Sequence, residues 1–178
     1  FDEQGTFKGL IADLLANISA RTGIQFEAVR ESTVAGVVGL VSSGKADVLG
    51  AVTSSTAREN QLGFTRPYLT TPFVLTTRMG PDAPETLDDM AGRRVALVRG
   101  NVLRAFIVQN YPDIQVVDAD NPPAALSMVA EGKADGAICA LVSARYLVSR
   151  RFDKQLQITS TVGTQPEQIG FATAGADA

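Results

Sequence analysis

The stretch LVSSGKADVLGA at residues 40–51 is nearly repeated as MVAEGKADGAIC at residues 128–139. Each copy has an apolar helix end, then Gly-Lys-Ala-Asp, then an apolar run short enough to be a buried strand. Gly44 and Gly132 suit the left-handed backbone conformation that ends a helix, and the lysine after each favours the negative helix end. One helix-to-strand unit used twice predicts two similar α/β lobes, and a cleft between lobes is a usual place for a small ligand.

Helices and strands are predicted to alternate along the rest of the chain. Apolar periodicity and cap residues predict helices at residues 7–22, 33–44, 102–110, 124–131 and 143–151. Strands are predicted at residues 24–29, 48–52, 73–77, 93–98, 114–117, 136–140, 156–159 and 169–172. This alternation predicts the α/β class, with mainly parallel sheets whose two faces are covered by helices.

The composition excludes several classes of function. The 178 residues carry a net charge of −3 without a Lys/Arg cluster, which argues against a nucleic-acid partner. There is no histidine, so His-based triads and the usual zinc sites are excluded. Cys139 is the one cysteine, so it has no intrachain disulfide partner and is expected to be a small buried hydrophobe. No run of 18 or more apolar residues, which a membrane span needs, is present.

No catalytic residues, metal ligands or cofactor site are predicted. Asp47 and Asp135 close the two Gly-Lys-Ala-Asp units, where turn hydrogen bonding explains them better than acid–base chemistry. Residues 98–101 contain a single glycine, so they do not form a Gly-rich phosphate loop. We therefore expect a binding domain and not an enzyme.

A polar turn after the first repeat unit is the best candidate site. The candidate contacts there are Thr53, Ser54, Ser55 and Arg58. They follow a buried strand, and ligands of open α/β sheets collect at the carboxyl ends of strands. Arg58 can hold a carboxylate through two parallel hydrogen bonds. The alternative is a capped surface turn in which Arg58 pairs with Glu59 or Glu31.

The matching position in the second half is the turn at residues 99–102. It lies between a predicted strand end and a helix N-terminus, whose free N–H groups favour an anion. Asn101 and Val102 are the candidate contacts from this side. The alternative is a helix start capped by Asn101, which needs no ligand.

These motifs resemble the type 2 periplasmic solute-binding (Venus flytrap) family over almost the whole chain. The resemblance rests on residues 5–14, on Gly44–Asp47 with Arg58 and Phe64–Tyr68 after it, and on Leu87–Gly92 followed by Val95–Gly100. It implies two lobes joined by two hinge strands, with the ligand between them. By this likeness Arg58 would hold a ligand carboxylate, Thr53 and Ser55 would add hydroxyl contacts, and the backbone at Asn101 and Val102 would close from the second lobe. We expect lobe 1 at residues 1–72, lobe 2 at 73–162 and a return segment to lobe 1 at 163–178.

Two departures from the family bear on the ligand. Amino-acid binders of this family commonly carry an acidic residue, which holds the ligand ammonium, near the place of Ala140, and a threonine where Val102 stands. The chain therefore lacks the usual α-amino clamp. Residues 64–78 and 121–147 are most similar to periplasmic sensor domains of virulence-sensor-type hybrid histidine kinases.

This resemblance implies a periplasmic domain that senses a small carboxylate and binds no cofactor. The domain would be attached to the membrane only through other parts of a parent sensor kinase. Such a kinase would bring two copies together as a homodimer. The alternative is a free periplasmic protein that delivers polar amino acids to an ABC importer. A third, enzymatic alternative is a flytrap-fold dehydratase or the non-catalytic lobe of a wall-cleaving enzyme.

Overall fold

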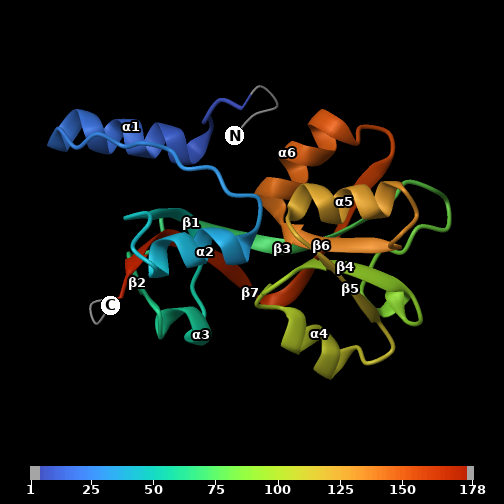
Figure 1. Ribbon diagram of the computed structural model, residues 1–178. Helices are drawn as coiled ribbons and strands as arrows, with labels where there is room; N and C mark the ends of the chain where they lie inside the picture. The colour runs from blue at the N-terminus through green and yellow to red at the C-terminus, as the bar shows by residue number, and fades with distance from the viewer. Residues whose placement is uncertain (1–4, 176–178) are drawn as a thin grey trace.

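The computed structural model describes residues 5–175 as a mixed sheet with helices on its faces (Figure 1). The helices are α1 (Leu10–Thr22), α2 (Val34–Ser42), α3 (Thr56–Glu59), the 3-10 helix η1 (Asp88–Met90), α4 (Arg104–Asn110), α5 (Pro122–Ala130) and α6 (Leu141–Arg151). The strands are β1 (Leu49–Thr53), β2 (Leu62–Phe64), β3 (Leu69–Arg78), β4 (Arg94–Val98), β5 (Gln115–Ala119), β6 (Gly136–Ala140) and β7 (Leu156–Ala174). The outermost residues of the expected first lobe and return segment, 1–4 and 176–178, lie outside this description.

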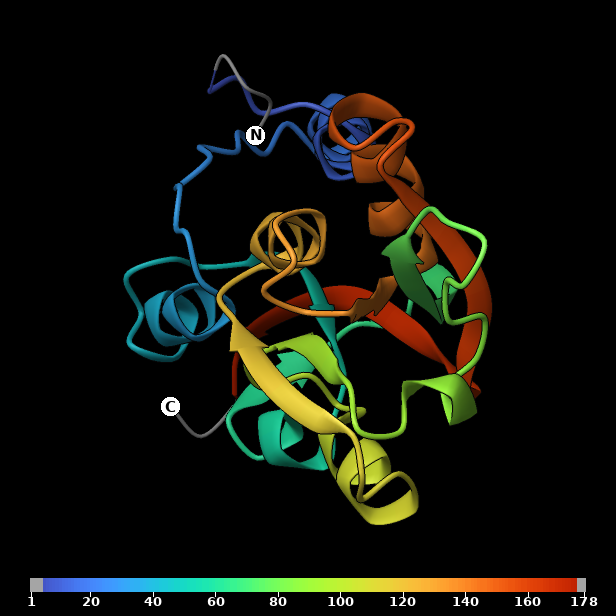
Figure 2. The same ribbon diagram turned by 90° about the vertical axis from the view of Figure 1, so that its right-hand side faces the viewer.

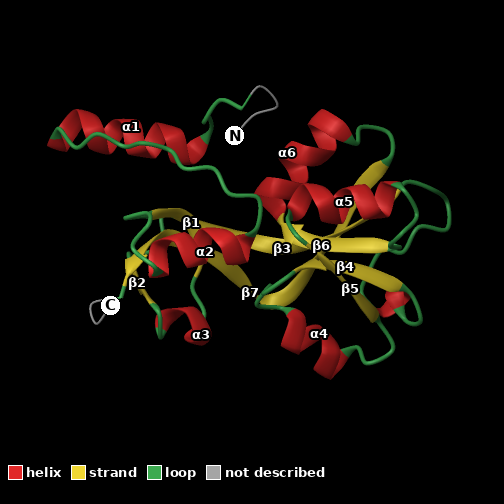
Figure 3. Ribbon diagram, viewed as in Figure 1, coloured by secondary structure: helices red, strands yellow, loops and turns green. Residues whose placement is uncertain are grey.

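Two long strands connect the halves of the molecule. The sheet order is β1-β7-β3-β6-β4-β5, with β2 also paired to β7, so β3 and β7 lie between the two sets of shorter strands (Figure 3). Their pairing changes register between Thr71 and Phe73, and Gly163 in β7 has a φ of 80°. The expected lobe boundaries fall at these irregularities within the hinge strands, and the boundaries themselves stay predictions.

The expectation of mainly parallel pairing is wrong in one respect. Strand β4 pairs in parallel with β5 and β6, as the alternation of strands and helices predicts. The other four strand pairs run antiparallel, because β3 and β7 cross between the halves in opposite directions. Residues 156–159 and 169–172, predicted as two strands, belong to this one continuous β7.

The two Gly-Lys-Ala-Asp units have the same backbone geometry. Gly44 and Gly132 adopt φ values of 71° and 73°, in the left-handed region. After the first glycine, the N–H groups of residues 45 and 46 both donate to the carbonyl of Leu40. After the second, the N–H groups of residues 133 and 134 both donate to the carbonyl of Met128. The repeat therefore is a structural device that ends α2 and α5 and starts a strand.

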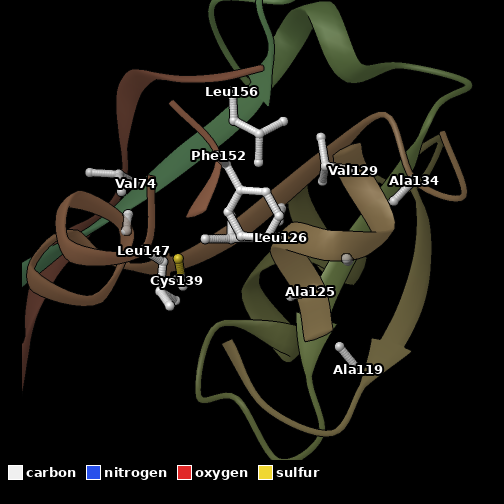
Figure 4. Packing of buried hydrophobic residues seen from close by; sticks show 13 residues of the cluster. Val74, Ala119, Ala125, Leu126, Val129, Ala134, Cys139, Leu147, Phe152 and Leu156 are labelled. Carbon is white, nitrogen blue, oxygen red and sulfur yellow. The ribbon is translucent and has the colours of Figure 1, made fainter. Parts of the chain in front are cut away.

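The second half has a hydrophobic cluster on each face of its sheet. In β4 and β6, Ala96, Ala137 and Cys139 face α5 and α6, whereas Val95 and Leu97 face the opposite side and pack with Ile107 of α4. This alternation follows from the two-residue period of a strand. Figure 2 shows α5 and α4 on opposite sides of the sheet, and Figure 4 shows the first cluster, with Phe152 beside Leu126.

The predicted strand at residues 24–29 is absent from the described structure. Its apolar side chains Ile24, Phe26 and Val29 are 53%, 38% and 56% exposed. A strand requires a hydrogen-bonded neighbour, and no described strand pairs with this segment. The alternating sequence pattern is therefore not enough to place this segment in the sheet.

Candidate functional site

A cavity of about 230 Å³ lies between the two halves of the molecule. The first half contributes α2, β1 and α3. The second contributes the end of β4 with the turn after it, the start of α5, and the region from β6 into α6, and the hinge strands β3 and β7 contribute Phe73, Glu167 and Ile169. Most of its wall is apolar, formed by Val34, Val37, Ala51, Val52, Phe73, Val98, Val102, Pro122, Cys139, Ala140 and Ile169. An apolar cavity with few polar groups is typical of a small-molecule site.

Arg58 is the basic side chain that bridges this cavity. Helix α3 positions it, and the carbonyl of Ser55 starts that helix by accepting the N–H of Arg58 at 2.9 Å. The guanidinium donates through Nη1 to the carbonyl of Thr53 at 2.9 Å and through Nη2 to the carbonyl of Gly100 at 3.0 Å. Glu59 bonds Ser54 and Glu31 bonds Ser32, so the alternative in which Arg58 pairs with either acid is not what the structure shows. Arg58 instead joins the two halves.

Glu167 is the acidic side chain of the cavity. It lies on β7, is half-buried, and its Oε1 accepts a hydrogen bond from the hydroxyl of Thr53. Burial raises the pKa of the Glu167 carboxyl, while the Thr53 bond and the charge of Arg58 act in the opposite direction and are weaker. Burial likewise lowers the pKa of the Arg58 guanidinium, against the charge of Glu167. One cation and one acid therefore lie on either side of Thr53.

The predicted hydroxyl contacts divide into two groups. Thr53 lines the cavity and links Arg58 to Glu167 through its carbonyl and its hydroxyl. Ser54 and Ser55 do not line it. The hydroxyl of Ser54 donates to Glu59, and the backbone carbonyl of Ser55 caps α3. Thr53 is therefore part of the cavity wall, because it is the last residue of β1, whereas Ser54 and Ser55 form hydrogen bonds to α3.

From the second half, Asn101, Val102 and Ala140 all line the cavity. Helix α4 begins at Arg104, two residues later than predicted. The N–H of Asn101 donates to the carbonyl of Val98, and its side-chain oxygen accepts the N–H of Leu103 at 2.8 Å. Asn101 thus acts as a turn residue before α4, and the alternative in which it caps the helix start is wrong, because the N-cap position is Leu103.

The sequence reasoning missed Glu167 and Ser143. Ser143 lies on α6 and faces the cavity beside Ala140. A signal for Glu167 did exist, since it stands two residues before Ile169 and so shares its face of an extended strand. Cys139, expected to be a buried hydrophobe, is 3% exposed, and burial together with the charge of Glu167 raises its pKa to about 12.

Neither metal binding nor a membrane span is indicated. In residues 5–175, Asp, Glu and Cys side chains do not gather in any group of three suited to a metal ion. Over the same residues, the helices are too short or too polar to cross a bilayer.

The fold and its cleft define a two-lobed Venus flytrap domain. The profile of the bacterial extracellular solute-binding proteins, family 3, matches residues 1–156, and the chain belongs to this family. It is 41% identical over 172 residues to the Virulence sensor protein BvgS of Bordetella pertussis, covering 97% of this chain and 14% of that protein.

Solved structures agree with this assignment. The crystal structure of the periplasmic VFT2 domain of B. pertussis BvgS matches with a TM-score of 0.88 and 40% identity, covering 97% of this chain and 73% of that one. Holo ArgBP from T. maritima matches with a TM-score of 0.84 and 27% identity, covering 99% and 76%. This chain is accordingly a periplasmic domain of the sensor and solute-binding kind, and it is not an enzyme.

Proposed function

We propose that this chain is the ligand-sensing domain of a transmembrane sensor histidine kinase and that it binds a small carboxylate between its lobes. The kinase context is supported by the 41% identity to a virulence sensor protein. Because this chain spans 14% of that relative, kinase activity and assembly into a homodimer are proposed for a longer parent protein.

The observation that carries the carboxylate proposal is the position of Arg58. Its guanidinium lines an otherwise largely apolar cavity and has five N–H donors, of which two are used by the bonds to Thr53 and Gly100. The remaining donors suit the two oxygens of a carboxylate. Among the other predicted residues, Thr53 faces the same space, Asn101, Val102 and Ala140 form the opposite wall, and Ser54 and Ser55 would act by holding α3.

Signalling would follow from a shift between lobe arrangements. A ligand that contacts both lobes stabilises the closed arrangement by its difference in affinity for the two states. The hinge strands β3 and β7 carry residues of both lobes, so their relative twist would pass the change on.

Calorimetry with a matched ligand set tests the site. Butyrate and butyramide have nearly the same shape and differ in charge. We expect butyramide to bind at least about tenfold more weakly than butyrate, because a tenfold loss of affinity corresponds to roughly one charge-assisted hydrogen bond. Arg58→Ala should abolish butyrate binding, whereas Arg66→Ala, an exposed arginine outside the cavity, should not change it. Unchanged butyrate affinity in Arg58→Ala would place the site elsewhere.

A second candidate is a free solute-binding protein for amino acids, favoured by the likeness to holo ArgBP. The lack of an acid at Ala140 argues against it, since that position lines the cavity without a charge. Binding of L-2-aminobutyrate at least as tight as that of butyrate would favour this candidate.

A further inference from the structure

Glu167 is a cavity residue to which carboxylate binding at Arg58 gives no role. Its Oε1 accepts the hydroxyl of Thr53, and the carbonyl of Thr53 accepts from Arg58. Arg58 and Glu167 make no direct ion pair with each other in the described residues. Glu167 is therefore linked through Thr53 to Arg58, the cation that would receive the ligand.

The charges around Glu167 are few. Arg58 faces it from α3 and Cys139 from β6, and the raised pKa of Cys139 keeps that thiol uncharged. On β3 its cross-strand partner is Thr71, which does not titrate. Arg99 lines the far side of the cavity and interacts with Asp118 and Asp120 at 3.9 and 3.5 Å. Arg58 is thus the cation whose charge acts on Glu167.

A bound carboxylate changes this balance. Before binding, one guanidinium and one ionised Glu167 compensate each other. After binding, two carboxylates lie near the Arg58 guanidinium in a cavity whose walls are largely apolar, while Arg99 on the far side is already paired with Asp118 and Asp120. Two nearby carboxylates do not both stay ionised easily, and the pKa of one of them rises. Burial already raises the pKa of Glu167, which makes it the group to be protonated.

We infer that the cleft takes up a carboxylate and a proton together, with the proton bound by Glu167. This inference rests on the proposed function, because it needs the carboxylate at Arg58. The proton comes from the solvent and adds to an oxygen of Glu167, while the ligand stays ionised. The protonated carboxyl still accepts the Thr53 hydroxyl and gains an O–H donor that can point to the ligand. The domain would then report acidity and carboxylate concentration as one signal.

Titration calorimetry of butyrate between pH about 5.5 and 8.5 tests this, since a simple carboxylate is ionised over that range. The affinity should fall as pH rises, by up to about tenfold per pH unit where one proton is taken up. Buffers of different ionisation enthalpy should give observed enthalpies that differ in proportion, which reports proton uptake directly.

Glu167→Gln is the decisive variant, because glutamine keeps an oxygen for the Thr53 hydroxyl and resembles the protonated acid. It should bind butyrate at pH about 8.5 as tightly as the natural chain does in acid, without a pH slope or proton uptake. Glu85→Gln, which removes an exposed acid that does not line the cavity, should keep the natural pH slope.

The outcomes separate this inference from the proposed function. Butyrate binding that depends on Arg58 but shows no pH slope and no proton uptake would overturn the role of Glu167 and leave the carboxylate site standing. A pH slope that persists in Glu167→Gln would also overturn it. No butyrate binding at any pH, or binding that does not need Arg58, would overturn both.

Discussion

The guanidinium of Arg58 donates a 3.0 Å hydrogen bond to the backbone carbonyl of Gly100, which lies 42 residues away in the opposite half of the molecule. A second hydrogen bond, from Nδ2 of Asn121 to the carbonyl of Ser32 at 3.2 Å, joins the halves elsewhere. Both bonds join a side chain in one half directly to a backbone carbonyl in the other half. Arg58 therefore contributes to closure of the cleft as well as to its charge.

Replacing Arg58 with lysine should favour the open arrangement of the lobes. Lysine keeps the positive charge but not the planar fork that reaches two carbonyls. Loss of one charge-assisted bond at a partly exposed site would shift the equilibrium by about 1 kcal/mol, or roughly fivefold. Small-angle X-ray scattering should show a larger radius of gyration for Arg58→Lys and no change for Arg66→Lys. Identical scattering of all three proteins would mean that this bond does not hold the lobes.

Gly132→Ala should destabilise the domain by about 1–2 kcal/mol, because a side chain at a φ of 73° meets the following carbonyl. Crowding by other parts of the protein is not the cause, since a Cβ at Gly132 has no atom within 4 Å outside the glycine and its two chain neighbours. Gly39→Ala, within α2 and with equally open space, should instead stabilise by about 0.5–1 kcal/mol. Urea unfolding of both variants measures the contrast, and equal effects would refute the assignment of Gly132 to a helix-ending position.

Asp135→Asn should destabilise the protein at neutral pH. Asp135 accepts the backbone N–H of Arg94 at 2.9 Å and interacts with the side chains of Arg94 and Arg78. Burial alone would raise the pKa of this carboxyl, but the bonds from Arg94 and Arg78 outweigh burial and hold its pKa below the ordinary value. We expect a loss of about 1–3 kcal/mol, the cost of losing hydrogen bonds to a charged group.

The pH dependence of that loss follows from the lowered pKa. The ionised carboxylate stabilises the fold at pH values above the unfolded-state pKa, and this contribution disappears as the pH falls through the lower folded-state pKa. The difference in unfolding free energy between the natural chain and Asp135→Asn should therefore be full at pH about 7 and shrink below pH about 4. A difference that stays constant down to the lowest measurable pH would show that the charge of Asp135 contributes nothing.

Cys139 should resist thiol reagents in the folded protein. Its side chain is 3% exposed, and its pKa of about 12 leaves almost no thiolate at pH about 8. Labelling by iodoacetamide should require unfolding in urea. Ser149→Cys, on the exposed side of α6, adds a matched accessible thiol that should react under native conditions. Rapid native labelling of the natural chain would mean that the cavity wall at β6 opens readily.

Much of the fold could be predicted from local patterns. Thr33 caps α2 by accepting the N–H of Gly36 at 3.0 Å, and Asn121 caps α5 by accepting the N–H of Ala124 at 2.9 Å. Such signals act between residues three or four positions apart, so they are legible in the sequence. The two Gly-Lys-Ala-Asp units are of the same kind and correctly predicted a duplicated helix-to-strand unit.

What the sequence by itself determined was therefore most of the helices and strands, the family, and Arg58 as a candidate residue that lines the cleft. Only the tertiary structure decided that β7 is one continuous hinge strand, that residues 24–29 stay unpaired in the described structure, and that Glu167 shares Thr53 with Arg58. The physical reason is distance along the chain. Thr53 and Glu167 are 114 residues apart, and their contact arises from antiparallel pairing of β7 with β1 and β3, whose register no local pattern encodes.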